Sequence, residues 1–150
     1  MIYFLTFLWA LPSGLIWLIN AEAMVVYQVT VDPEAAPWLI ALAATAGQFI
    51  GYGALYHFAS LVLTKLDFVR RSVAKVKIQN AGWGTWTMFT TGGLMGIPPL
   101  LGLFTLYGSK KVGPLAGFLL CAVPMRLVWY TSWAYAAEFM RENFSFFSHG

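Results

Sequence analysis

The chain has 150 residues, of which 59% are hydrophobic and only 10% are charged, and its formal net charge is +3. Ordinary soluble domains carry about a quarter charged residues, which help to cover the surface that faces water. The composition therefore excludes an ordinary soluble domain and indicates a membrane protein.

Long stretches of the chain lack charged side chains. Apart from one arginine in the last, four stretches contain no Asp, Glu, Lys or Arg: 1–21, 36–64, 83–109 and 112–137. A helix that spans a bilayer needs about 20 apolar residues, and all four stretches reach this length. We therefore expect a single all-α membrane domain over 1–150.

The first apolar segment, 1–31, is interrupted twice. A Pro-Ser-Gly sequence at 12–14 breaks one apolar run, and Asn20 with Glu22 breaks the next. Proline removes a backbone donor and clashes with the preceding helical turn. The segment is therefore either a hairpin that opens to the outside or a plain span. It lacks the basic start of a signal peptide, so we expect it to be retained.

Glu22 is the carboxylate that lies inside an apolar run. An ionised carboxylate in hydrocarbon costs at least a few kcal/mol, so it should pair with a cation, take up a proton or face water. The functional interpretations are a proton-coupling acid or half of an intramembrane ion pair. The alternative is that the first helix ends near Asn20 and Glu22 lies at the interface.

The span 36–64 carries both small and polar residues at regular spacing. Polar side chains recur every four residues: Gln48, Tyr52 and Tyr56. Gly47 and Gly51 form a Gly-xxx-Gly pair, which lets a second helix approach closely. One interpretation is a packing face, and the other is a polar stripe that lines a substrate cavity.

The linker 65–82 is basic. Its basic residues are Lys65, Arg70, Arg71, Lys75 and Lys77, and with Asp67 they give a net charge of +4. The positive-inside rule places this linker in the cytoplasm. It is either a short interfacial helix, with Arg70, Arg71 and Lys75 against anionic lipid headgroups, or a solvated loop. The basic residues are confined to this region and give no indication of nucleic-acid binding.

The apolar segment 83–109 contains helix breakers near its middle: Gly92, Gly93, Gly96, Pro98 and Pro99. Each half has about a dozen residues, or roughly 20 Å of helix, which is too short for about 30 Å of hydrocarbon. We predict a re-entrant hairpin that turns at these residues. The hairpin returns Lys110 and Lys111 to the cytoplasmic side, whereas the alternative, a kinked span, places them outside.

The last span, 112–137, contains Arg126, and the tail 138–150 follows. Arg126 lies about 15 residues after Lys111, or roughly 22 Å at helical rise, which is a long way for a side chain to reach back to the interface. The functional interpretations are binding of an anion or lipid phosphate, or pairing with Glu22. The alternative is a side chain that extends to a nearby interface.

These elements combine into an inverted repeat. A broken segment followed by a span (1–31 with 36–64) precedes a second such pair of opposite orientation (83–109 with 112–137), an architecture found in transporters. Irregular backbone at membrane depth is tolerated only where protein or a water-filled cavity satisfies it. The predicted fold is therefore an all-α polytopic membrane protein with two re-entrant hairpins and two spans, and the broken segments indicate a site.

Enzymatic chemistry has no visible basis in the sequence. We find no phosphate-binding loop, no zinc-protease motif and no nucleophile elbow, and Cys121 is the single cysteine. We expect no enzyme, no metal and no cofactor.

The order of the parts resembles the DedA family, also called the VTT or SNARE-associated family, and its short YqaA-like branch. The resemblance covers most of the chain. Residues 43–56 resemble the family's glycine and tyrosine helix, and 99–118 resemble its second hairpin with the start of the last helix. Glu22 falls where the family carries an acid, and Arg126 resembles the arginine of the short branch.

The resemblance implies movement of lipid across a bacterial inner membrane, such as flipping of polyprenyl-phosphate carriers or scrambling of phospholipids, with coupling to a proton or ion gradient as an option. In the second hairpin, Gly92 and Pro98 stand where many members have two arginines. The alternative function is a non-transporting integral membrane subunit. Expected partners are membrane lipids and either a second copy of the chain or another membrane protein.

Overall fold

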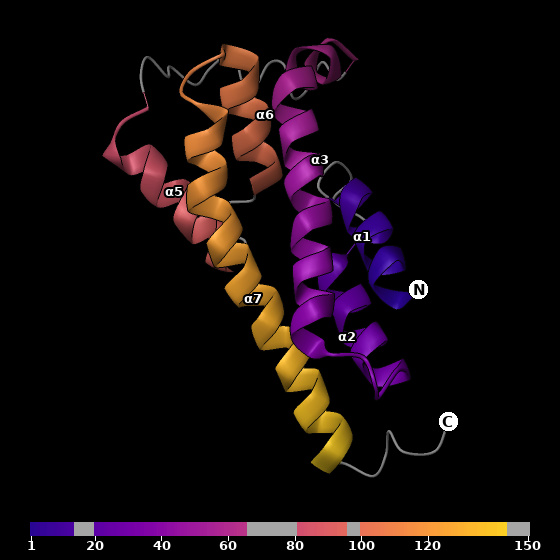
Figure 1. Cartoon of the computed structure of the whole chain (residues 1–150). Helices are drawn as coiled ribbons and strands as arrows, with labels where there is room; N and C mark the ends of the chain where they lie inside the picture. The colour runs from indigo at the N-terminus through magenta and orange to yellow at the C-terminus, as the bar shows by residue number, and fades with distance from the viewer. Residues whose placement is uncertain (14–19, 66–80, 96–99, 144–150) are drawn as a thin grey trace. The chain divides into compact units, whose positions relative to one another are not determined.

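The computed structural model describes residues 1–13, 20–65, 81–95 and 100–143. Within these ranges all regular secondary structure is helical, which confirms the all-α prediction (Figure 1). The helices are α1 (Ile2–Ser13), α2 (Ala21–Val31), α3 (Pro37–Lys65), α5 (Trp83–Met95), α6 (Leu100–Lys110) and α7 (Leu115–Asn143). Parts of two predictions lie outside the described residues: the headgroup contacts of Arg70, Arg71 and Lys75, and the turn at Gly96, Pro98 and Pro99.

Two of these helices are long and apolar enough, by length and composition, to cross a membrane. They are α3 over Pro37–Ala59 and α7 over Leu115–Asn143. Each helix has 29 residues, or about 43 Å at 1.5 Å per residue. The predicted span 36–64 matches α3 closely. The helix α7 is longer than the predicted span 112–137, because it continues through the start of the expected tail to Asn143.

The start of α2 is fixed by a local cap. Asn20 has extended backbone, and its side-chain oxygen accepts a hydrogen bond from the Ala23 amide at 3.1 Å. This places Glu22 in the first turn of α2, where free backbone N–H groups and the helix dipole favour a negative charge.

The helices pack into two compact units. The terminal unit comprises Met1–Gly51 and Arg126–Gly150, and the central unit comprises Tyr52–Met125. The long helices α3 and α7 therefore each contribute one part to the terminal unit and the other part to the central unit.

In the terminal unit, α1 and α2 run in opposite directions. At one end the Trp9 indole donates a hydrogen bond to the Asn20 carbonyl, and at the other the Ala36 amide donates to the Tyr3 hydroxyl. The buried core consists mainly of small and aliphatic residues: Ala10, Ala21, Val25, Val29, Ala35, Ile40, Ala41, Ala44, Tyr130, Ala134 and Ala137. Small side chains let the helix backbones lie close together.

The backbones of α1 and α3 lie close together at Gly47. A Cβ atom at this position would collide with the carbonyl oxygen of Phe7 and would lie 3.0 Å from the Cβ of Ala10. Gly47 therefore has the packing role that the Gly-xxx-Gly spacing predicted.

In the central unit, α5 and α6 also run in opposite directions. Thr85 pairs with Tyr107 through their hydroxyls at 2.8 Å, and Phe89 packs on Phe104 at 4.9 Å between ring centroids. The core is rich in rings and leucines: Tyr52, Leu55, Phe89, Leu100, Leu103, Phe104, Tyr107, Phe118, Leu119 and Ala122.

The prediction of a turn at Gly92 and Gly93 is wrong for these two residues. Both are buried inside α5, which continues to Met95. At Gly93 a Cβ atom would collide with the carbonyl oxygen of Ala122 on α7. The glycine thus permits close helix packing here and does not end the helix.

Candidate functional site

An ion pair joins two helices of the terminal unit. The Arg126 Nη2 atom on α7 lies 2.8 Å from Oε1 of Glu22 on α2. The Arg126 side chain is 12% exposed and the Glu22 side chain 25% exposed. The pairing of Glu22 with Arg126, one of the interpretations left open by the sequence, is therefore present in the structure.

The Arg126 side chain also contacts Gln48 and Tyr130. Its Nε atom donates a hydrogen bond to Oε1 of Gln48 on α3 at 3.1 Å. Its guanidinium also lies over the ring of Tyr130, 5.0 Å from the ring centroid, in a cation–π arrangement. Because Tyr130 follows four residues later on α7, it lies on the same face of the helix. These contacts fix the planar guanidinium in one orientation.

Glu22 receives a second donor from α7. The indole Nε1 of Trp129 donates to the same carboxylate oxygen, Oε1, at 3.1 Å. Sequence reasoning missed Trp129. The available signal was its position three residues after Arg126, which places both side chains on one helical face.

The network continues from Gln48 to α1. The Gln48 amide nitrogen donates to the Ser13 hydroxyl oxygen at 2.9 Å, and the Ser13 hydroxyl donates to the Ala10 carbonyl at 2.6 Å. Gln48 is only 3% exposed. Four helices, α1, α2, α3 and α7, thus contribute to one connected set of polar groups, which we call the polar network: Ser13, Glu22, Gln48, Arg126 and Trp129.

The three residues of the polar stripe predicted on α3 do not share one site. Gln48 joins the polar network, whereas Tyr52 stacks on Phe104 in the central unit with 5.0 Å between ring centroids. Tyr56 donates its hydroxyl to the Gly113 carbonyl at 2.7 Å. Gly113 has φ +79°, a conformation that glycine adopts without strain.

The polar network is arranged to bind an anionic oxygen. The Arg126 guanidinium and the Trp129 indole both donate to the same oxygen, Oε1 of Glu22. Within the part of the chain that the structure describes, no group of three or more His, Cys, Asp or Glu residues could hold a metal ion.

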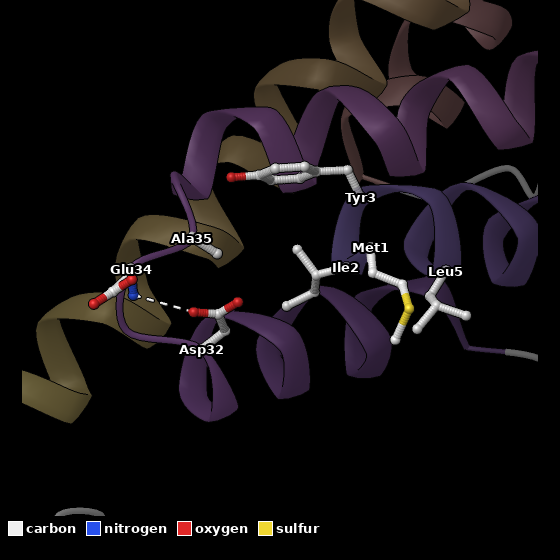
Figure 2. Close-up of a pocket in the computed structure, with 7 residues that line it drawn as sticks. All are labelled: Met1, Ile2, Tyr3, Leu5, Asp32, Glu34 and Ala35. Atoms are coloured by element: carbon white, nitrogen blue, oxygen red, sulfur yellow. Dashed lines mark hydrogen bonds between the residues drawn. The ribbon is translucent and has the colours of Figure 1, made fainter.

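A cavity of about 400 Å³ lies elsewhere in the terminal unit (Figure 2). It is lined by Met1, Ile2, Tyr3, Leu5, Asp32, Glu34 and Ala35. Figure 2 shows the two carboxylates on the turn after α2 and the apolar side chains on α1. Asp32 accepts a hydrogen bond from the Glu34 amide at 3.2 Å, which is a local turn contact. The polar network, which joins four helices, therefore remains the stronger candidate site.

Comparisons of the chain with protein-family models, with curated proteins and with solved structures give no match. The resemblance to the DedA family thus stays a prediction that rests on the order of the sequence elements and on Glu22 and Arg126.

Proposed function

We propose that the chain is an integral membrane transporter or lipid translocase and that the polar network is its coupling site. The observation that carries this proposal is the ion pair between Glu22 and Arg126, which joins apolar parts of α2 and α7. Such charges are expensive in a membrane and are retained mostly where a pathway or a proton relay needs them.

The short helices support the proposed re-entrant hairpins. With 12, 11, 13 and 11 residues, α1, α2, α5 and α6 are each about 16–20 Å long and cannot cross about 30 Å of hydrocarbon alone. The helices of each pair are antiparallel, so both could enter and leave the membrane from one side. In this proposal α3 and α7 are the two full spans.

The helix lengths support the proposed inverted repeat. The series α1, α2, α3 has 12, 11 and 29 residues, and the series α5, α6, α7 has 13, 11 and 29. Gln48 is the twelfth residue of α3, and Arg126 is the twelfth residue of α7. Their hydrogen bond therefore joins equivalent positions, as expected where two repeats meet around a central site.

In this proposal Glu22 is the coupling acid and Arg126 its counter-ion. Proton uptake by Glu22 releases Arg126 and Trp129, which can then bind an anionic group such as a lipid phosphate. Proton release restores the ion pair and expels the anion. In this proposal one carboxylate thus alternates between a proton and an arginine.

Transport is tested with purified protein in vesicles of phosphatidylcholine and phosphatidylglycerol that contain a trace of fluorescent phosphatidylglycerol. Accessibility of the probe to an external quencher reports lipid movement, and the rate is measured over a range of pH. We expect a pH-dependent rate for the wild type and a lower, pH-independent rate for Glu22→Gln. Glu34→Gln, at an exposed acid outside the polar network, is the control. Equal rates for wild type and Glu22→Gln at every pH would refute the coupling role.

The hairpins are tested by cysteine accessibility through 83–109 in a Cys121→Ala background. We expect both ends of the segment to react with a membrane-impermeant maleimide from the cytoplasmic side. Labelling of the two ends from opposite sides would show a single span and would remove the re-entrant hairpin.

A non-transporting membrane subunit is the second candidate. It is favoured by the apolar surface of α7, where large exposed side chains such as Leu120, Trp133 and Phe139 offer contacts to a helix of a partner protein. Purification in mild detergent separates the two functions. Stoichiometric retention of another membrane protein, with no lipid movement by the isolated chain, would favour the subunit.

A further inference from the structure

The hydroxyl of Ser13 has a defined direction. Its hydrogen is committed to the Ala10 carbonyl at 2.6 Å, because a carbonyl oxygen can only accept. The Ser13 oxygen is therefore an acceptor toward Gln48. This hydroxyl lies at the last residue of α1 and is buried.

The Gln48 amide is oriented by requirements at both of its ends. Its nitrogen must face the Ser13 oxygen at 2.9 Å, because that oxygen accepts. Its carbonyl oxygen must face the Arg126 Nε at 3.1 Å, because a guanidinium only donates. One amide orientation satisfies both neighbours, and the opposite orientation satisfies neither.

The orientation of Gln48 in turn selects the edge of the guanidinium that Glu22 meets. With Nε bound to Gln48, the Nη2 atom lies 2.8 Å from Glu22 Oε1. A guanidinium is planar and rigid, so fixing one nitrogen fixes the directions of the others. A series of hydrogen bonds therefore connects the end of α1 to the ion pair between α2 and α7.

Gly47 sets the spacing between α1, which carries Ser13, and α3, which carries Gln48. It lies one residue before Gln48, at a point where the backbones of α1 and α3 lie too close for a side chain. A side chain at 47 would separate the two helices without altering any group of the polar network.

We propose that Ser13 and Gln48 are positioning residues that hold Arg126 against Glu22, so that displacement of the end of α1 loosens the ion pair. As a regulatory device this inference rests on the proposed function, since the ion pair is the proposed coupling site. Movement of α1 relative to α3 then controls how readily Glu22 exchanges its partner.

The test measures hydrogen exchange at the Arg126 Nε–H group by NMR, with ¹⁵N-labelled arginine in the purified full chain in detergent. Arg126→Lys identifies the signal by its disappearance. We expect Ser13→Ala to accelerate the exchange about tenfold, the change that loss of one buried hydrogen bond produces. Ser13→Thr, which restores the hydroxyl, should return the rate to within about twofold of wild type.

Gly47→Ala is the second variant, because it changes the spacing of α1 and α3 but replaces no side chain of the polar network. It should accelerate exchange as Ser13→Ala does. The matched controls are Gly53→Ala, where a Cβ meets no atom within 4 Å, and Ser132→Ala, at an exposed hydroxyl on α7. Both should keep the wild-type rate.

Unchanged exchange in a folded Ser13→Ala or Gly47→Ala protein would overturn the inference. Equal acceleration by Ser13→Ala and Ser13→Thr would also overturn it, because packing and not the hydroxyl would then be responsible. The measurement needs no transport. A wild type that moves no lipid but shows the expected exchange pattern would refute the proposed function and leave the positioning role intact.

Discussion

The terminal and central units are built from the same kinds of helix but differ in what fills them. Each has two short antiparallel helices and a part of each long helix. The terminal unit joins small residues to a partly buried ion pair and an amide, whereas the central unit packs aromatic rings around Phe118. Rings give close, directional packing, and buried charges are costly to retain. We therefore expect the central unit to contribute more to stability, and we propose the terminal unit as the part of the chain that carries the function.

The largest expected effect on stability lies in the central unit. Phe118 is fully buried, stacks on Phe89 at 4.2 Å and lies 5.3 Å from Trp86, measured between ring centroids. Phe118→Ala should lower the free energy of unfolding in detergent by about 3–5 kcal/mol, through lost contacts and a cavity. Leu120→Ala, at a side chain that is 75% exposed, is the control. Equal losses for the two variants would contradict the stabilising role of the rings.

The second prediction concerns the ion pair. Removing one partner of a fully buried pair costs about 3–5 kcal/mol, and partial exposure reduces this, so Arg126→Leu should cost about 2 kcal/mol in unfolding free energy. The double variant Glu22→Leu with Arg126→Leu should recover part of the loss, because no unpaired charge remains. Glu142→Gln, at an exposed acid on α7, should have little effect. Additive losses in the double variant would show that the charges do not interact.

A smaller effect is expected from helix spacing in the central unit. At Gly108 a Cβ atom would collide with the Tyr56 backbone, whereas at Gly102 on the same helix it meets no atom within 4 Å. Gly108→Ala should cost about 1–3 kcal/mol. Gly102→Ala should stabilise α6 by up to about 1 kcal/mol, because alanine favours the helix. The two unfolding free energies should therefore change in opposite directions, and a gain at Gly108 would contradict the close approach.

The smallest predicted change in stability concerns Trp129. Trp129→Phe keeps most of the ring but removes the indole donor to Glu22. We expect a loss of about 1 kcal/mol in unfolding free energy, typical of one hydrogen bond. Trp133→Phe, at an exposed ring on the same helix, is the matched control, and a larger loss at Trp133 would remove the proposed role of the indole.

The sequence allowed prediction of those features that depend on charge and helix breakers. Glu22 and Arg126 are isolated charges in apolar runs, and such charges need partners, so their pairing was one of the interpretations that the sequence left open. Gly92 and Gly93 were assigned to a turn because glycine disfavours helices, but close packing on α7 overrides that local preference. The roles of Ser13 and Trp129 depend on which helices meet, and spacing along a single helix does not specify that.

Transport by a matched pair of variants tests the division of roles between the units most directly. Arg126→Gln changes the polar network, and Thr85→Val removes the buried hydroxyl pair with Tyr107 in the central unit. Lipid movement per folded protein is measured in the same vesicles. We expect Arg126→Gln to abolish transport and Thr85→Val to retain it. Retained transport in Arg126→Gln, or equal loss in both variants, would contradict the assignment of function to the terminal unit.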